Sequence, residues 1–214
     1  MNSSKGETFR FIPKNWIILA QGITDKGADL FIRLKFTPNS LSTLGMAAGI
    51  GAGLFFYIRR PLWAGILILI CGLFDGLDGK VALKTERKSA YGAILDSSLD
   101  RYSEFFIFMG LALYFRPQWI MWLSILAFFG SLMVSYTRAR AEGLGFECQI
   151  GIMQRAERLV LLILGSLVGS VFNIFPISMG IVLSLIVLFS NMTAFQRILC
   201  VKKAEKQEHS KKEG

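Results

Sequence analysis

Six apolar stretches dominate this chain, and as helices they would have lengths that suit the hydrocarbon core of a bilayer. Apolar residues make up 53% of the 214 residues, and the mean hydropathy is +0.49, which is too apolar for an ordinary soluble domain. The sequence therefore predicts an all-α integral membrane protein with six transmembrane helices. Their expected ranges are about 41–58, 62–74, 91–115, 119–136, 157–171 and 176–195, and the second should continue as a helix through Asp75 and Asp78 towards Leu83.

The first forty residues differ from the rest, because their apolar clusters alternate with Lys and Arg. We expect residues 1–40 to form an amphipathic juxtamembrane segment with an interfacial helix, and no secretory signal peptide. Thr37-Pro38-Asn39-Ser40 should break the chain and cap the next helix. Residues 41–198 would form one six-span domain. Residues 199–214 would be a charged cytoplasmic tail, and its composition favours disorder.

The formal net charge of +9 first suggests nucleic acid as a partner, but its distribution favours a membrane. Every Lys and Arg except Arg59, Arg60 and Arg116 falls in segments predicted to lie on one side. By the positive-inside rule that side is the cytoplasm, and it holds both termini. We expect a multi-pass protein of the cytoplasmic membrane that binds no nucleic acid. Contact with anionic membrane lipids explains the basic tail as well as any role in chemistry.

The cysteines and the histidine offer no site of their own. Cys71, Cys148 and Cys200 are scattered, so we expect neither a disulfide framework nor a zinc site. Cys71 lies in an apolar stretch and should be a small buried side chain. His209, the single histidine, lies in the charged tail, which argues against histidine chemistry.

Four aspartates interrupt the second and third apolar stretches: Asp75, Asp78, Asp96 and Asp100. Each pair is spaced to share one helix face, and ionised carboxylates in a membrane are costly unless something compensates them. Two such helices facing each other would bring four repelling carboxylates together. Hard divalent cations relieve that repulsion, because they prefer oxygen ligands. The alternative, four solvated carboxylates at helix ends, is disfavoured by the shared faces.

The spacing of these residues resembles a family signature. Asp75-x-x-Asp78-Gly79-x-x-Ala82, followed by Gly92-x-x-x-Asp96-x-x-x-Asp100, is similar to the motif of the CDP-alcohol phosphatidyltransferases. One position departs from it, since Leu83 stands where the family has Arg. Lys80, Lys84 or Arg87 could replace that arginine, although a lysine lacks its bidentate geometry.

The resemblance implies a role for each matching residue. Asp75, Asp78, Asp96 and Asp100 would hold Mg²⁺ or Mn²⁺, as two ions, and Asp100 would also be the general base. The CDP-activated lipid would be bound by Asn39, Ser42, Asp75, Gly79, Ala82, Lys84 and Gly92. The glycines could equally serve helix packing. A homodimer is also expected from the resemblance.

A second region indicates the acceptor. The segments 136–143 and 155–158 resemble the corresponding parts of prokaryotic phosphatidylinositol-phosphate synthases. The resemblance implies that Arg138, Arg155 and Arg158 bind the phosphate of the acceptor, as clustered arginines can do through charge-assisted bonds. Helix capping and ordinary topology charges remain the alternative for these arginines.

These patterns together predict a phospholipid synthase. It would transfer a phosphatidyl group from a lipid of the CDP-diacylglycerol type to a phosphorylated polyol, foremost inositol phosphate, and release CMP. One alternative is the same chemistry with glycerol phosphate, inositol or serine. Another is a non-catalytic membrane protein that binds or transports ions, which the strict aspartate spacing disfavours.

Overall fold

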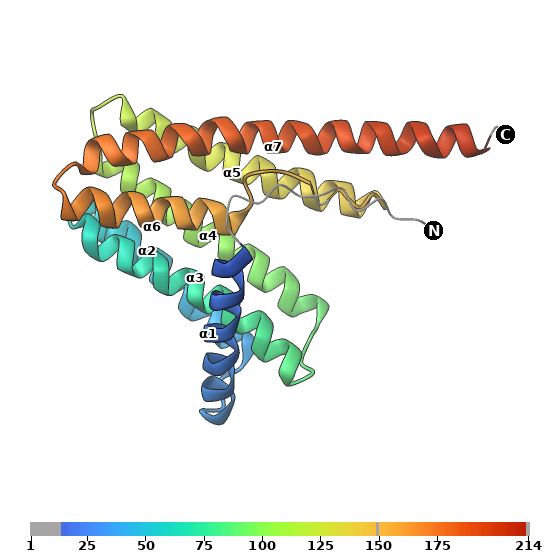
Figure 1. Cartoon of the computed structure of the whole chain (residues 1–214), viewed down its shortest axis with the longest axis horizontal. Coiled ribbons are helices and arrows are strands. Elements are labelled where there is room, and N and C mark those ends of the chain that lie inside the picture. Colours follow the sequence, from blue (N-terminus) through green and yellow to red (C-terminus); the bar gives the residue numbers. More distant parts are fainter. Residues whose placement is uncertain (1–13, 149, 213–214) are drawn as a thin grey trace.

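The structure is a computed structural model that describes residues 14–148 and 150–212, in which all regular structure is helical (Figure 1). The helices are α1 (Lys14–Arg33), α2 (Pro38–Tyr57), α3 (Pro61–Lys84), α4 (Ala90–Tyr114), α5 (Ile120–Gly143), α6 (Arg155–Val171) and α7 (Phe175–Lys212). The helices from α2 onward begin close to the starts of the six predicted stretches. The all-helical prediction is confirmed for the described residues.

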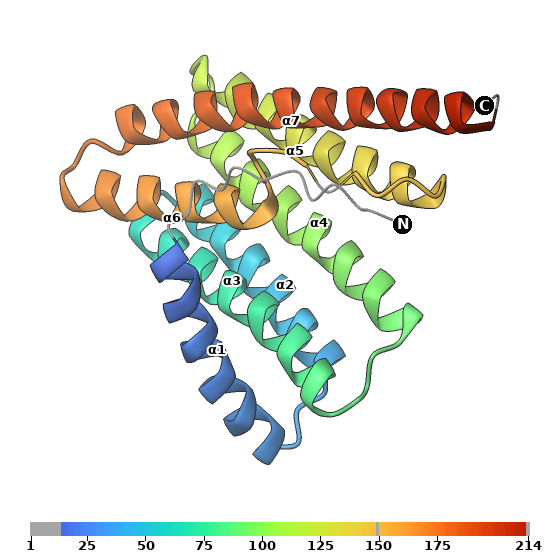
Figure 2. The same ribbon diagram turned by 45° about the vertical axis from the view of Figure 1, so that its right-hand side comes forward.

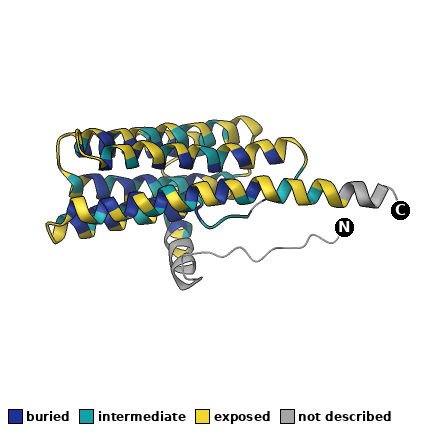
Figure 3. Cartoon of the chain, turned by 90° about the horizontal axis from the view of Figure 1, so that it is seen from above, coloured by how far each residue is buried: buried dark blue, intermediate teal, exposed yellow. Residues whose placement is uncertain are grey.

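Three of the described helices, α2, α5 and α7, are long and apolar enough to cross a membrane by length and composition alone. The other helices at predicted spans are less clear for identifiable reasons. α3 and α4 carry the aspartates, and α6 has only 17 residues. Many residues on the outer sides of the helices are exposed (Figure 3). They include large apolar side chains such as Trp122, Phe129, Phe172 and Phe195, as a lipid-facing surface would.

α2 lies between α3 and α4, and α5 packs on α7 while α6 contacts both α3 and α7 (Figure 2). The apolar core includes Phe56, Phe108, Phe115 and Phe175. α2 and α4 approach almost to backbone contact, because a Cβ atom at Gly110 would overlap the backbone of Gly53. The close approach of this helix pair therefore depends on glycine at both positions.

α1 packs against α3 beside the start of α2. Ala28 of α1 is buried with Leu41, Leu77 and Val81. Two ion pairs join α1 to α3, since Lys80 Nζ lies 2.6 Å from Asp25 Oδ1 and Lys84 Nζ lies 2.6 Å from Asp29 Oδ1. The hydrogen bond from Lys80 lowers the pKa of the Asp25 carboxyl from its ordinary value. The first thirteen residues of the predicted juxtamembrane segment lie outside the described residues.

The predicted cap of α2 is present. Thr37 Oγ1 accepts a hydrogen bond from the Ser40 amide at 3.2 Å, and Ser40 Oγ accepts one from the Thr37 amide at 3.0 Å. This reciprocal arrangement satisfies two amides at the helix start. It fixes where α2 begins, and so where Asn39 and Ser42 lie relative to α3.

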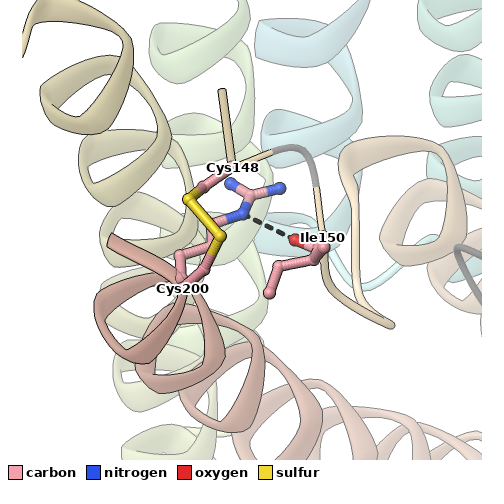
Figure 4. Close-up of a disulfide and its surroundings, with 4 residues drawn as sticks. Cys148, Ile150 and Cys200 are labelled. Carbon is pink, nitrogen blue, oxygen red and sulfur yellow. Dashed lines mark hydrogen bonds between the residues drawn. A yellow bond between two sulfur atoms is a disulfide. The ribbon is translucent and has the colours of Figure 1, made fainter. Parts of the chain in front are cut away.

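Two predictions about the last third of the chain are wrong. As far as the structure describes the charged tail, it is helical rather than disordered, because α7 continues through Lys212, and the Lys, Glu, Gln and Ala residues of this part favour helix (Figure 1). Cys148 and Cys200 form a disulfide, although they are 52 residues apart in sequence (Figure 4). Their Cα atoms are 6.1 Å apart because the loop after α5 folds back against α7. Cys71 is buried, as expected.

Candidate active site

α3 and α4 bring three of the four aspartates together. Asp75, Asp78 and Asp96 each offer one carboxylate oxygen, and these oxygens all lie within 4.8 Å of one another. Asp78 is 5% exposed, and its Oδ2 accepts a hydrogen bond of 2.6 Å from Ser42 Oγ of α2. The packing of α2 against both helices thus places a hydroxyl beside the carboxylates and orients one of them.

The composition of this cluster suits a hard divalent cation. All three candidate ligand atoms are carboxylate oxygens, which Mg²⁺ and Mn²⁺ prefer. Among the described residues, no partner hydrogen-bonds the buried Asp96 Oδ1. A buried carboxylate oxygen without a partner is costly, and a bound cation would compensate it. The residues therefore fit the predicted metal.

Asp100 lies one helical turn beyond Asp96 and is joined to the cluster through an arginine. Arg155, the first residue of α6, places Nη2 2.8 Å from Asp100 Oδ1. Its Nη1 forms an ion pair with Asp75 Oδ1. Arg101 Nη1 is 3.6 Å from the other oxygen of Asp100. The fourth predicted ligand is thus at the edge of the cluster, within reach of a basic region.

That basic region forms one wall of a cavity of about 390 Å³, which includes Asp75. Its arginines come from four helices: Arg101, Arg138, Arg155, Arg158 and Arg197. Three of them are the predicted acceptor residues, and we will call this the arginine cavity. Arg197 of α7 was not predicted, although an arginine at the end of an apolar stretch is a signal in itself. Arg197 is only 3% exposed.

Arg158 differs from the other predicted acceptor residues because its guanidinium is held by the protein. It is 1% exposed, and its Nη2 donates to Glu104 Oε1 at 2.7 Å. Glu104 Oε2 accepts a second bond of 2.5 Å from Ser131 Oγ. A role for Glu104 was not predicted either, although Glu104 follows Asp96 and Asp100 on the same face of α4, one further turn along the helix.

A second cavity of about 260 Å³ lies on the other side of the cluster, between the starts of α2 and α4 and the end of α3. We will call it the glycine cavity, because Gly79 and Gly92 line it together with Asn39, Ser42 and Ala82. All five are predicted CDP-lipid residues. Asp78 and Asp96 also line it, whereas Asp75 lines the arginine cavity. The carboxylate cluster therefore lies between the two cavities.

The structure separates two explanations of the glycines. A Cβ atom at Gly79 would have no neighbour within 4 Å, so this glycine leaves open space in the glycine cavity. A Cβ atom at Gly76 would lie 3.2 Å from Thr24 of α1, so Gly76 serves helix packing. Both explanations hold, each at a different position.

The predicted role of Lys84 does not match its position. Lys84 Nζ bonds to Asp29 and, at 3.1 Å, to the carbonyl oxygen of Asp25, so it is turned towards α1. It does not line the glycine cavity, whereas Arg87 and Lys88 of the following loop do. Leu83, which stands at the arginine position of the motif, is 60% exposed. The basic groups nearest to the glycine cavity therefore come from the loop after α3.

Comparisons with known proteins agree with this arrangement. The chain is 36% identical over 171 residues to the archaetidylinositol phosphate synthase of Pyrococcus horikoshii, a match that covers 79% of this chain and 86% of that protein. It is 31% identical over 188 residues to the phosphatidylinositol phosphate synthase of Cutibacterium acnes, covering 83% of this chain and 91% of that protein.

Solved structures are similar as well. The phosphatidylinositol phosphate synthase of Mycobacterium tuberculosis with CDP-DAG bound matches with a TM-score of 0.76 and 28% identity, over 84% of this chain and 93% of that one. The same enzyme in complex with manganese and citrate matches with a TM-score of 0.76 and 27% identity, over 83% of this chain and 88% of that one. Residues 35–199 match the family model of CDP-alcohol phosphatidyltransferase. The chain therefore belongs to the CDP-alcohol phosphatidyltransferase family of membrane enzymes.

Proposed function

We propose that this enzyme transfers a phosphatidyl group from a lipid of the CDP-diacylglycerol type to a hydroxyl of inositol phosphate and releases CMP. The observation that carries the proposal is the position of the carboxylate cluster between two cavities of different character. The glycine cavity has room for a nucleotide, and the arginine cavity has the charge for a phosphorylated acceptor. The names of the similar synthases, one archaeal and one bacterial, support the inositol phosphate acceptor.

Asp75, Asp78 and Asp96, with Asp100 at the edge, would hold two Mg²⁺ or Mn²⁺ ions. Ions held there would polarise phosphoryl oxygens and neutralise charge on the leaving CMP. Asp100 would accept the proton of the attacking hydroxyl, because its ion pair with Arg155 places it next to the arginine cavity. Ser42 would keep Asp78 in the orientation that the cluster needs.

The donor would occupy the glycine cavity. The nucleotide would contact Asn39, Ser42, Gly79, Ala82 and Gly92. Asp75 would interact with the donor as a member of the carboxylate cluster. Arg87 and Lys88 would supply the positive charge that Leu83 lacks, whereas Lys84 would brace α1 against α3. The acyl chains would extend into the surrounding lipid.

The acceptor would occupy the arginine cavity. Arg155 and Arg138 would bind its phosphate, because both line the cavity and Arg138 is half-exposed beside Glu142. Arg158 would act from behind this site, since its guanidinium is engaged by Glu104. A site built from cations discriminates strongly against a neutral acceptor, because desolvated arginines would then lack a partner.

We also propose the arrangement in the membrane. The helices α2 to α7 would be the six spans, α1 would lie in the interface, and residues 41–198 would form the catalytic domain. The uneven distribution of Lys and Arg supports a cytoplasmic position for the active site, both termini and the charged tail. Labelling of single cysteines at position 88 and in the tail should report the same side of a cytoplasmic membrane. Labelling on opposite sides would contradict this topology.

The expected assembly is a homodimer, which the family resemblance supports. Mass measurement in native-like lipid should give twice the mass of the chain, and a monomer alone at all concentrations would count against it.

The function is tested by offering several acceptors in parallel. Purified protein with CDP-diacylglycerol and Mg²⁺ or Mn²⁺ would receive inositol phosphate, glycerol phosphate, inositol or serine, and CMP release would be measured. Inositol phosphate should be used best, and neutral acceptors should be rejected. If glycerol phosphate, inositol or serine is used best instead, the assigned acceptor is wrong, but the assigned phosphatidyl transfer still holds. No CMP release with any acceptor would favour a non-catalytic ion-binding protein. Repeating the assay with an ether-lipid donor would define the lipid class.

A further inference from the structure

One face of α7 holds the segment that leads into α6. Thr193, Arg197 and Cys200 are spaced so that they share a face of the helix. Each of them contacts the chain between α5 and α6. We will call residues 150–153 of that chain the entry segment, because Gln154 and Arg155 follow it directly and begin α6.

Thr193 makes the central contacts. It is fully buried, and its Oγ1 accepts hydrogen bonds from the amides of Ile152 at 3.1 Å and Met153 at 3.0 Å. These two amides have no helical partner, because they precede the first turn of α6. A single hydroxyl of α7 thus satisfies two amides of the entry segment.

Two further links reinforce this contact. Arg197 Nε donates to the carbonyl oxygen of Ile150 at 2.9 Å, and the Cys148–Cys200 disulfide lies beside that bond (Figure 4). Gly151 has a φ of +132°, and a Cβ atom at this position would overlap the side chain of Thr193. The backbone of the entry segment is therefore shaped closely against Thr193.

The entry segment matters because the residues after it form a wall of the arginine cavity. Residues 154–158 all line that cavity, and they include Arg155, which contacts Asp75 and Asp100. Arg158 Nη1 also donates back to the carbonyl oxygen of Met153 at 3.4 Å. A shift of the entry segment would move both arginines relative to α4.

We propose that Thr193, together with the Cys148–Cys200 disulfide, positions the first turn of α6 and thereby sets the affinity for the acceptor. Thr193 is a positioning residue in this proposal, because it touches the entry segment and not the arginine cavity. The proposal rests on the proposed function of the arginine cavity as the acceptor site. According to the proposal, binding of the donor in the glycine cavity does not depend on Thr193.

The test compares three variants. Thr193→Val keeps the shape but leaves the part-buried amide of Ile152 and the buried amide of Met153 unpaired, so the KM for inositol phosphate should rise roughly tenfold. The KM for CDP-diacylglycerol should stay within about twofold of the parent, because the glycine cavity is formed by other elements. Thr193→Ser keeps the hydroxyl and should restore the parental values. Ser190→Ala is the matched control, since Ser190 is a fully buried hydroxyl of α7 with no hydrogen-bond partner among the described residues.

A second readout does not depend on turnover. Amide hydrogen exchange over residues 150–156 should accelerate in Thr193→Val and remain parental in Thr193→Ser and Ser190→Ala. Parental exchange in Thr193→Val would overturn the proposal whatever the acceptor is. If exchange accelerates in Thr193→Val but the parent protein uses no phosphorylated acceptor, the proposed function is wrong, whereas the contact of Thr193 with the entry segment is not. Equal loss of affinity for both substrates in Thr193→Val would also contradict the proposal.

The disulfide is tested by reduction. Dithiothreitol would give two electrons and two protons to the cysteine pair, yielding two thiols and its own cyclic disulfide. Reduction should raise the KM for inositol phosphate and accelerate exchange over residues 150–156. In a Cys148→Ala/Cys200→Ala double variant, both values should already be raised and dithiothreitol should change nothing further. Maleimide labelling that finds Cys148 and Cys200 free in the unreduced protein, or a double variant with parental acceptor KM, would overturn the covalent part.

Discussion

Arg155 Nη2 lies 2.8 Å from Asp100 Oδ1, and this contact joins the carboxylate cluster to the arginine cavity. The two residues come from helices that are not consecutive in the chain, α6 and α4. The same guanidinium also pairs with Asp75 of α3. Three helices therefore meet at one side chain, between the proposed ions and the proposed acceptor phosphate.

Asp100→Asn should lose turnover while keeping most of its affinity for the CDP-lipid. The amide cannot accept the hydroxyl proton, but the glycine cavity is lined by other residues. Turnover should fall by roughly a hundredfold or more, in line with removal of a general base. Product formation and equilibrium binding of CDP-diacylglycerol would be measured separately. A loss of donor affinity in proportion to the loss of turnover would make Asp100 chiefly a metal ligand.

Asp75→Asn, Asp78→Asn and Asp96→Asn should each weaken metal binding, because each removes a negative charge that the cluster provides. The melting temperature of the parent should rise when Mn²⁺ is added and return to its metal-free value when EDTA is added, since a ligand that binds only the folded state stabilises it. The response to Mn²⁺ should be reduced in the three variants. Asp29→Asn is the control, because Asp29 pairs with Lys84 outside the cluster. Robust CMP release in excess EDTA would refute the metal assignment.

Arg155→Ala should lower kcat/KM for inositol phosphate. The loss of transition-state stabilisation should be about 1.5–3 kcal/mol, the cost of a lost charged hydrogen bond. Donor affinity should change little, because Arg155 does not line the glycine cavity. Initial rates at varied acceptor and fixed donor would give the acceptor parameter, and the reverse series would give the donor parameter. A variant as active as the parent would remove Arg155 from the acceptor site.

Arg158→Ala should instead act on stability. It would leave Glu104 buried without its partner, and breaking a buried pair in this way costs about 3–5 kcal/mol. The free energy of unfolding in detergent would be compared with that of Arg138→Ala, which removes an exposed arginine paired with Glu142. That control should unfold within about 1 kcal/mol of the parent. Equal stability of the two variants would contradict a structural role for Arg158.

Gly110→Val should destabilise the protein severely, because even a Cβ atom would overlap the backbone of Gly53 and force α2 and α4 apart. Gly143→Val is the matched control at the end of α5, where an added Cβ atom has no neighbour within 4 Å. Thermal melting in detergent would report both effects. If Gly110→Val melts at the same temperature as the parent, the two helices can separate without loss of stability, and the expectation is wrong.

The sequence by itself determined the helices and the family. A long apolar stretch in a membrane is expected to be helical, because a helix satisfies its own backbone groups where lipid offers no partners, and the apolar stretches read in this way begin close to the starts of α2 to α7. The spacing of Asp75, Asp78, Asp96 and Asp100 placed each pair on one helix face, because helical periodicity is a local property. The same spacing indicated the family.

Only the tertiary structure decided which distant residues meet. Glu104 and Arg158 are 54 positions apart, and no local pattern says that these two charges are paired rather than free. Likewise, no local pattern indicates that Lys84 pairs with Asp29 of α1 or that Arg197 lines the arginine cavity. The pairing of Cys148 with Cys200 and the contact of Thr193 with the entry segment depend on α7 packing beside the loop after α5. Periodicity fixes the face of a helix, but the packing of whole helices selects the partner of that face.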